Sequence, residues 1–353
     1  MHVLVIGAGI IGVSVAESLA RHGAEVTVLD MRSPGRGASQ ASAGILAPFS
    51  EADPASPLLG LGRRSLDLYD EFIARVREAS GLNVEYARTG TLEVALDENE
   101  REHLLRAKAW LDAEGETASW LEAADLRLFE PTVTSAAAGA LHIHRHGFVN
   151  VRALVTALVQ AARLAGAVFE DGVEVAAIES SGGGVSVRTR AGRVLAADGV
   201  VIAAGAWSRR LRIAGAGPVG VRPIRGQLLH LRATAGAQPA RVVWGTGCYA
   251  VPWGDGSLLV GASVEDVGFD EGTTVEGVAA LAGAVAKLMP ACAGASIEAI
   301  RVGLRPIADA GAPLIGPAPG VPNVTLATGH YRNGILLAPL TAALVTGTLL
   351  GAN

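Results

Sequence analysis

The chain begins, after Met1, with His2-Val3-Leu4-Val5-Ile6-Gly7-Ala8-Gly9-Ile10-Ile11-Gly12, an apolar run that leads directly into a Gly-x-Gly-x-x-Gly motif. This pattern predicts a buried strand over 2–6 and a helix over 10–22, with the glycines in the turn between them. In such a turn the first glycine permits the tight bend, the second lets a pyrophosphate approach, and the third lets helix and strand pack closely. The stretch therefore predicts a βαβ unit that holds phosphates at a helix N-terminus.

An acidic residue ends the next predicted strand, which covers 24–30. Asp30 follows the glycine motif by about 20 residues, the distance at which a carboxylate accepts hydrogen bonds from ribose hydroxyls. The motif and Asp30 together predict a bound dinucleotide. They do not distinguish FAD from NAD.

A run of small residues favours FAD. It reads Gly37-Ala38-Ser39-Gln40-Ala41-Ser42-Ala43-Gly44-Ile45-Leu46, and one interpretation of it is a flexible loop. An NAD site needs no second cradle of this kind, whereas the ribityl chain and ring of a flavin need backbone to pass close by. The run therefore points to a flavoprotein.

The composition limits the class of protein. The 353 residues suit two domains, and 50% hydrophobic with 18% charged residues indicates a large buried core. The net charge of -5 gives no basic footprint for nucleic acid. Cys248 and Cys292 lack any metal or disulfide spacing, and the N-terminus lacks the features of a signal peptide. We therefore expect a cytoplasmic protein.

The rest of the pattern alternates helices with strands. We expect helices over 59–79, 97–114, from Asn150 to 164, over 274–288, and a short one opened by the capping-box pattern Ser119-Trp120-Leu121-Glu122. We expect strands over 84–95, 172–179, 184–190, 193–196, 199–205, 227–232, 248–252, 257–262, 296–301 and 322–328.

The expected fold class is α/β, with a Rossmann-like FAD-binding domain interleaved with a mixed-sheet α+β substrate domain. No internal repeat or low-complexity linker separates the two in the sequence. We assign 1–82, 146–219 and 317–353 to the FAD-binding domain, and 83–145 and 220–316 to the substrate domain.

The last segment combines an arginine with an uncharged tail. Gly329-His330-Tyr331-Arg332-Asn333-Gly334 precedes 334–353, which carry no charged side chain. About 20 apolar residues are enough to span a bilayer, but Pro339, several threonines and the lack of a basic cluster argue against a membrane helix. We expect a buried helix that begins near Asn333 or Gly334, with Pro339 in its first turn. Arg332 and the positive end of that helix would then face an anion.

These motifs together resemble the FAD-dependent amino acid oxidases of the D-amino acid oxidase type, and within them the glycine oxidases of thiamine biosynthesis. The resemblance spans nearly the whole chain. Beyond the glycine motif with Asp30 and the 37–46 run, it rests on Ala203-Ala204-Gly205-Ala206-Trp207, on Gly303-Leu304-Arg305-Pro306 with Asp309, Pro313 and Gly316, and on Gly329 through Pro339.

The resemblance implies roles for individual residues. Arg332 matches the arginine that pairs with the substrate carboxylate over the flavin, and Tyr249 and Arg305 match further residues of that pocket. Noncovalent FAD is implied, because no cysteine lies near 303–306. The implied cofactor contacts are Gly7, Gly9, Ile10, Ile11, Gly12, Asp30, Met31, Arg32, Ala38, Ser39, Ala43, Gly44, Leu46, Val173, Ala204, Gly205, Trp207, His330, Tyr331, Arg332, Asn333, Gly334, Ile335 and Leu336.

Simpler interpretations stand beside these. Arg305 is also explained as a structural ion-pair arginine, Tyr249 as an ordinary strand aromatic, and His330 as a residue that positions backbone. His142, His144 and His146 alternate as on one face of a strand, but without a nearby carboxylate or cysteine pattern we expect partly exposed histidines and no metal site. Gly247 and Val264 are smaller than the side chains that glycine oxidases tend to carry near the substrate, which leaves the exact amine open.

The implied reaction is oxidation of a small amino acid, glycine first and sarcosine or D-alanine after it. Oxygen would accept the electrons and yield H2O2, and the glycine imine would supply the thiamine thiazole. A homotetramer is implied as well. The alternatives are a dehydrogenase of the same fold that uses a quinone or protein acceptor, an NAD(P) dehydrogenase, and a non-catalytic flavin-binding protein.

Overall fold

The first layer of the fold is a six-stranded sheet in the order β20-β21-β13-β1-β2-β9. The computed structural model describes residues 1–50, 56–181, 183–234 and 236–351. All neighbours in this sheet are parallel except β20, which runs antiparallel to β21. Its strands are β1 (His2–Ile6), β2 (Glu25–Asp30), β9 (Val168–Asp171), β13 (Gly199–Ile202), β20 (Leu314–Pro317) and β21 (Val324–Thr328).

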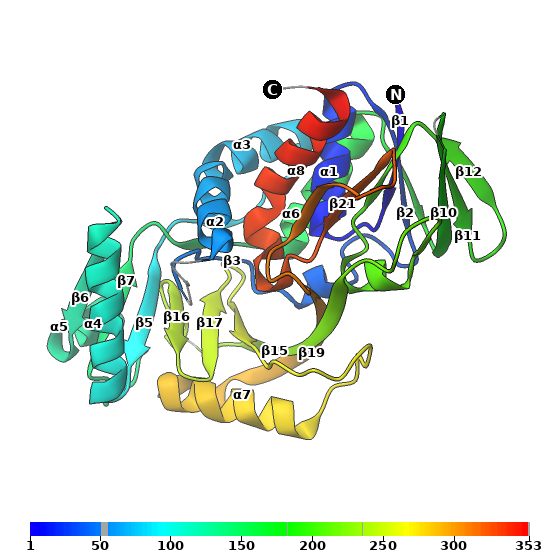
Figure 1. Ribbon diagram of the computed structural model, residues 1–353. Coiled ribbons are helices and arrows are strands. Elements are labelled where there is room, and N and C mark those ends of the chain that lie inside the picture. The colour runs from blue at the N-terminus through cyan, green and yellow to red at the C-terminus, as the bar shows by residue number, and fades with distance from the viewer. Residues whose placement is uncertain (51–55, 182, 235, 352–353) are drawn as a thin grey trace.

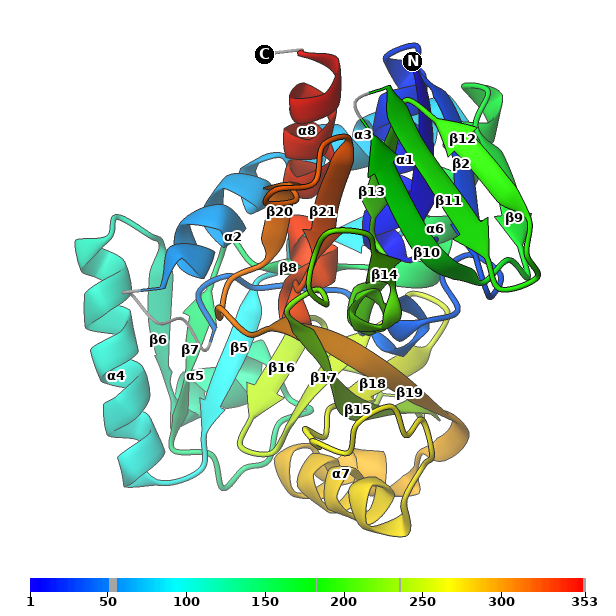
Figure 2. The ribbon, with the colours of Figure 1, turned by 45° about the vertical axis from the view of Figure 1, so that its right-hand side comes forward.

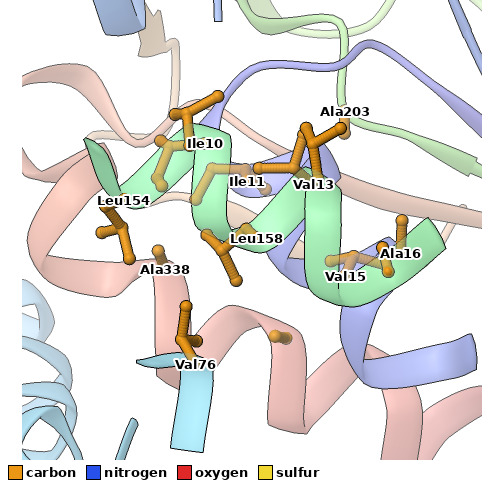
Figure 3. Packing of buried hydrophobic residues seen from close by; sticks show 14 of the residues in the cluster. Ile10, Ile11, Val13, Val15, Ala16, Val76, Leu154, Leu158, Ala203 and Ala338 are labelled. Atoms are coloured by element: carbon orange, nitrogen blue, oxygen red, sulfur yellow. The ribbon is translucent and has the colours of Figure 1, made fainter. Parts of the chain in front are cut away.

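The two faces of this sheet are covered differently, and the side chains of β1 show how. Helices lie on one face and a small sheet lies on the other (Figure 1). Val3 and Val5 are fully buried among the helices, whereas Leu4 and Ile6 are buried against the small sheet. Figure 3 shows the apolar side chains that join the helices. The helices are α1 (Ile10–Arg21), α3 (Tyr69–Ser80), α6 (Val151–Leu164) and α8 (Gly334–Leu350). The small sheet holds β10 (Val175–Ser181), β11 (Gly184–Thr189), β12 (Val194–Ala197) and β14 (Arg212–Ile213).

A second, eight-stranded sheet has the order β19-β15-β18-β17-β16-β5-β7-β6. It is mixed, because β16 and β5 are parallel while the other neighbours are antiparallel. Its strands are β5 (Thr91–Ala95), β6 (Ala118–Glu122), β7 (Gly139–Ile143), β15 (Val221–Arg232), β16 (Val242–Gly245), β17 (Cys248–Pro252), β18 (Ser257–Gly261) and β19 (Ser296–Ala308).

Helices cover the eight-stranded sheet on the side away from the first sheet. Helix α7 (Val275–Leu288) packs there through Leu281, Val285 and Leu288 (Figure 2). Helices α4 (Glu98–Ala113) and α5 (Ala123–Phe129) pack at the end formed by β5, β6 and β7.

Short elements connect the two sheets. Strands β3 (Ile45–Leu46), β8 (Gly147–Val149) and β4 (Tyr86–Ala87) form a three-stranded sheet between them, and α2 (Pro57–Asp67) precedes α3. The short 3-10 helices are η1 (Ala38–Ala41), η2 (Gly205–Arg210), η3 (Pro290–Gly294) and η4 (Tyr331–Asn333).

The expected fold class is confirmed: a parallel, nucleotide-binding type of sheet is interleaved along the chain with a mixed sheet. The domain boundaries given above stay a prediction.

Several local expectations were wrong. The capping-box pattern at 119–122 does not open a helix, since Ala118–Glu122 pairs with β7 as strand β6 and α5 begins only at Ala123. The helix expected over 59–79 is two helices that change direction at Leu68. The strand expected over 84–95 is interrupted by Gly90, whose φ of 79° is a conformation that favours glycine.

The uncharged tail folds as expected in one respect and not in another. Helix α8 begins at Gly334, which confirms its predicted start, but Pro339 lies inside the helix and beyond its first turn. Proline has no N–H for the carbonyl four residues earlier, that of Ile335. The hydroxyl of Tyr69 donates to this carbonyl at 2.6 Å, so the buried oxygen is satisfied from α3.

Residues 331–350 are the one stretch, within the described part of the chain, that is long and apolar enough to cross a membrane. Of the most apolar 18-residue window in this stretch, 56% is buried inside the protein. Helix α8 packs against α1 and α2, as a core helix does.

Candidate active site

A cavity of about 1320 Å³ lies between the two sheets. Its upper wall is formed where strands of the six-stranded sheet end, at Gly7 after β1, Asp30 in β2, Ala203 after β13 and Thr328 in β21. In open α/β sheets, ligands bind outside the carboxyl ends of the strands. The opposite wall is the inner face of β16, β17, β18 and β19.

The glycines of the Gly-x-Gly-x-x-Gly turn have two roles: some allow close packing of the backbone, and others line the cavity. Gly7 has a φ of 105°, and a Cβ there would lie 2.4 Å from the carbonyl oxygen of Ala203. A Cβ on Gly12 would lie 1.8 Å from the carbonyl oxygen of Gly7, so Gly12 lets α1 pack against β1 and does not line the cavity. Gly9, Ile10 and Ile11 do line it, at the N-terminus of α1.

Asp30 ties this turn to the end of β2. Its carboxylate accepts hydrogen bonds from the backbone N–H of Ala8 at 2.6 Å and of Arg32 at 2.8 Å. Burial raises the pKa of the Asp30 carboxyl against the opposing effect of these two hydrogen bonds. The carboxylate therefore orders both loops that would frame a ribose.

The run of small residues lies against the same turn. Ser39 accepts a hydrogen bond at Oγ from the N–H of Ile10, 2.9 Å away, and Ala38, Ala43 and Gly44 line the cavity. Leu46 does not line it, because its side chain is fully buried in the core of the helical layer.

Gly303 of the third motif packs against this run. A Cβ on Gly303 would lie 2.9 Å from the Cβ of Ala41 and 3.1 Å from the Cα of Ala38. Strand β19 therefore approaches the loop closely only because position 303 is glycine.

Two glycines make room for the side chains at the other end of the cavity. A Cβ on Gly226 would lie 2.2 Å from Nη2 of Arg305, and one on Gly261 would lie 2.4 Å from the hydroxyl oxygen of Tyr249. Arg305 and Tyr249 thus lie flat over the backbones of β15 and β18. The ring of Tyr249 also contacts that of Trp244, with centroids 5.2 Å apart.

The start of α8 completes this end. Tyr331 has a φ of 49°, a strained conformation for a bulky residue, and such strain is concentrated at functional sites. Arg332 lines the cavity, and its Cζ lies 5.2 Å from the centroid of the Tyr331 ring. Asn333, Gly334 and the first residues of α8 line the cavity behind it, which places the positive end of the helix dipole there.

His330 has a different role from its neighbours. It is 2% exposed, and its Nε2 lies 3.0 Å from Oγ1 of Thr341 in α8. Burial lowers the pKa of His330 to about 3, so the ring is neutral near pH 7. This arrangement fits the positioning role and not that of a base.

Six further predicted cofactor residues also line the cavity. Met31, Arg32, Val173, Ala204, Gly205 and Trp207 all line it. Arg32 also forms a two-pronged ion pair with Glu271, at 2.9 and 2.6 Å, and its Cζ lies 5.6 Å from a ring centroid of Trp207.

The cavity thus brings together every predicted site residue except Gly12 and Leu46, which do not line it. Of the two small residues noted above, Gly247 lines it and Val264 does not. Sequence reasoning missed Trp244 and Glu271. No local signal marks Glu271, because its partner Arg32 is 239 residues away along the chain.

The three histidines form no metal site. Among the residues described, no group of three or more His, Cys, Asp or Glu is arranged to hold a metal ion. The rings of His142 and His144 are tilted against each other with centroids 4.3 Å apart, but His146 is fully buried, contrary to the expectation of partial exposure. Its Nε2 accepts a hydrogen bond from the N–H of Phe49, which explains why the ring points inward.

Comparisons with known proteins agree with this architecture. A sequence model of the DAO family, described as FAD dependent oxidoreductase, matches residues 2–348. The chain is 35% identical to a glycine oxidase of Geobacillus kaustophilus over 344 residues, which covers 97% of this chain and 91% of the relative. The crystal structure of glycine oxidase from Geobacillus kaustophilus aligns with a TM-score of 0.93 at 34% identity, covering 99% and 95% of the two chains.

A longer relative matches as well. The bifunctional protein ThiO/ThiG of Nostoc sp. (strain PCC 7120 / SAG 25.82 / UTEX 2576) is 35% identical over 353 residues, which is 99% of this chain and 52% of the relative. This chain therefore spans about half the length of that protein.

Proposed function

Because this chain belongs to the DAO family of FAD-dependent oxidoreductases, we propose that it oxidises glycine to the imine, with sarcosine and D-alanine as poorer substrates. Family membership decides between FAD and NAD, which the glycine motif alone left open. The family and its amino acid oxidase relatives confirm the resemblance drawn from the sequence.

The observation that carries the proposal is that one cavity joins a dinucleotide cradle to two arginines. Gly7 and Asp30 line it from the carboxyl ends of β1 and β2, and Arg305 and Arg332 line it from β19 and the turn before α8. An amino acid has one carboxylate, and a planar guanidinium binds a carboxylate by two parallel hydrogen bonds. Such a pair fixes Cα in a single orientation.

The cradle fits FAD. Gly7 keeps the turn tight against the backbone of Ala203, a Cβ on Gly9 would meet no atom nearer than 3.5 Å, and the N-terminus of α1 offers backbone N–H groups to a pyrophosphate. When bound, FAD supplies the acceptor for the hydride that leaves the substrate Cα.

The residues of the chain then do three things. Arg332 binds the carboxylate and orients Cα. This orientation accelerates the reaction, because the reacting atoms are already held in the geometry that the reaction needs. The N-terminus of α8 offers its dipole to negative charge that develops during the reaction. The rings of Tyr249 and Trp244 limit the space for any substituent larger than the hydrogens of glycine.

The proposal also includes the pathway that uses the product, the electron acceptor, the location and the oligomeric state. The ThiO/ThiG relatives support a supply of imine to thiamine biosynthesis. Oxygen as electron acceptor with release of H2O2, noncovalent FAD, a cytoplasmic location and a homo-oligomeric state stay predictions.

A substrate panel in air tests the proposal. Purified, FAD-loaded protein is given glycine, sarcosine, D-alanine or D-proline, and both amino acid consumption and H2O2 are measured. We expect one H2O2 for each glycine consumed, and the highest kcat/KM with glycine. Consumption only with an added quinone would indicate a dehydrogenase, and no turnover of any amine would indicate a flavin-binding protein without this activity.

A further inference from the structure

A hydrogen-bonded network behind the cavity holds Arg305 in place. We propose that Glu265 and Gln227, which do not touch the cavity, position Arg305 for the substrate carboxylate through Ser263. This inference rests on the proposed function, in which Arg305 belongs to the substrate end. It adds two positioning residues that act on that end from outside.

The first link joins Arg305 to Ser263. Nη1 of Arg305 donates a hydrogen bond to the carbonyl oxygen of Ser263 at 2.8 Å. The guanidinium lies against the backbone at Gly226, where any side chain would collide with it. Arg305 therefore has one face fixed by Gly226 and one N–H direction fixed by Ser263.

The second link holds Ser263. Its Oγ donates to Oε1 of Glu265 at 2.5 Å and accepts from the backbone N–H of Gln227 at 2.8 Å. Its own N–H donates to the carbonyl oxygen of Gln227 at 3.2 Å. Three hydrogen bonds thus fix the residue whose carbonyl meets Arg305.

The third link anchors Glu265 to the sheet. Oε1 also accepts from Nε2 of Gln227 at 2.8 Å, and Oε2 accepts from Nη2 of Arg225 at 2.5 Å. Gln227 is fully buried and Arg225 is 3% exposed. Gln227 reaches further, to Thr274 at the N-cap of α7, so the network ends on rigid elements.

The network has the properties of a positioning device. Gln227, Ser263 and Glu265 do not line the cavity, whereas Arg305 does. Gln227 and Glu265 are each connected to Arg305 by two successive hydrogen bonds through Ser263. Buried polar networks that are fully satisfied keep their members in a single arrangement. Glu265→Gln replaces one carboxylate oxygen with an NH2 group, which sets a donor against either Arg225 or the donors of Ser263 and Gln227. The side chain must then shift, and the Ser263 carbonyl loses its fixed direction.

The test compares Glu265→Gln with Asp266→Asn in FAD-loaded protein. Asp266 is the matched control, because it is the next residue and pairs with Arg222 at the surface, away from Ser263. We expect Glu265→Gln to raise KM for glycine roughly tenfold while kcat stays within about twofold, and the FAD dissociation constant to stay unchanged. Asp266→Asn should leave all three constants unchanged.

A second probe does not depend on turnover. Acetate offers a carboxylate without an amine, and its dissociation constant is measured from the perturbation of the flavin spectrum. Glu265→Gln should weaken acetate binding by the same factor as it raises KM. If glycine is not oxidised but acetate binding still weakens, the proposed function fails and the positioning role stands. The positioning role is overturned if the unchanged protein does not bind acetate. It is also overturned if Glu265→Gln and Asp266→Asn bind acetate equally well.

A double-variant cycle shows whether the effect passes through Arg305. In an Arg305→Met background, Glu265→Gln should have no further effect on acetate binding, because coupled residues are not additive. Should Glu265→Gln fold poorly, Ser263→Ala replaces it, since it keeps the carbonyl and removes only the Oγ contacts. Additive effects of either variant with Arg305→Met would overturn the proposal.

Discussion

The hydroxyl of Tyr69 donates a 2.6 Å hydrogen bond to the carbonyl oxygen of Ile335. That carbonyl lies at the start of α8 and would pair with residue 339 if 339 were not proline. Both residues are buried, so the bond is shielded from water. A side chain of α3 therefore stabilises the helix terminus that faces the cavity.

Tyr69→Phe tests this contact. The variant keeps the ring and leaves a buried carbonyl without a donor, which should lower the free energy of unfolding by roughly 1–3 kcal/mol. Ser65→Ala is the matched control, because Ser65 donates to the carbonyl of Leu336, and Leu340 has an N–H to serve that carbonyl. Denaturant unfolding measures both, and an equal loss in the two variants would contradict the role assigned to Tyr69.

Arg332→Met should separate substrate binding from cofactor binding. We expect KM for glycine to rise by roughly ten- to a hundredfold, because a charged hydrogen-bonded pair contributes roughly 1.5–3 kcal/mol, while FAD stays bound. Arg209→Met, at an exposed arginine outside the cavity lining, serves as control. Steady-state kinetics and the flavin content after gel filtration are the measurements. Normal glycine kinetics in Arg332→Met would remove Arg332 from the substrate site.

Gly226→Ala should displace Arg305, since the new Cβ would lie 2.2 Å from its Nη2. The expected result is a fall in kcat/KM for glycine of at least roughly tenfold, with the protein still folded. Gly283→Ala in α7 is the control, because no atom lies within 4 Å of the added Cβ there and the change should raise the unfolding free energy by roughly 0.5–1 kcal/mol. Full activity of Gly226→Ala would show that Arg305 does not need its present position.

Acid should destabilise the protein through two buried histidines. Burial lowers the pKa of His146 and of His330 to about 3, from a value of 6.5 for an ordinary histidine. Between these values the unfolded chain takes up protons that the folded protein refuses, so the unfolding free energy falls as the pH drops below 6.5. Well inside that range each histidine contributes a slope of roughly 1.4 kcal/mol per pH unit.

The variant His146→Gln isolates one of these contributions. Unfolding by denaturant at pH 7.5 and at pH 5 should show a smaller difference for the variant than for the unchanged protein. An identical difference in the two proteins would mean that His146 does not resist protonation.

The sequence was most informative where local pattern and local structure coincide. The β1, α1 and β2 unit follows from an apolar run, three glycines and Asp30, all within 30 residues. The start of α8 follows from the change to an uncharged segment at Gly334. At both places the signal lies in consecutive residues, and both places line the cavity or pack beside it.

What escaped prediction depends on partners distant in the sequence. The 119–122 pattern is compatible with a helix, but pairing with β7 makes it a strand. Glu271 meets Arg32 only because the two sheets face each other, and Gln227 meets Glu265 only because the segment after β18 folds back on β15. His146 is buried beside Phe49, 97 residues earlier in the chain, whose N–H donates to its Nε2 and whose ring stacks on it.

Anaerobic addition of glycine to the FAD-loaded protein tests the central claim most directly. We predict that one equivalent of glycine bleaches the visible band of the flavin, and that admitting air restores the band with one H2O2 per FAD. A band that stays fully oxidised under excess glycine would contradict it.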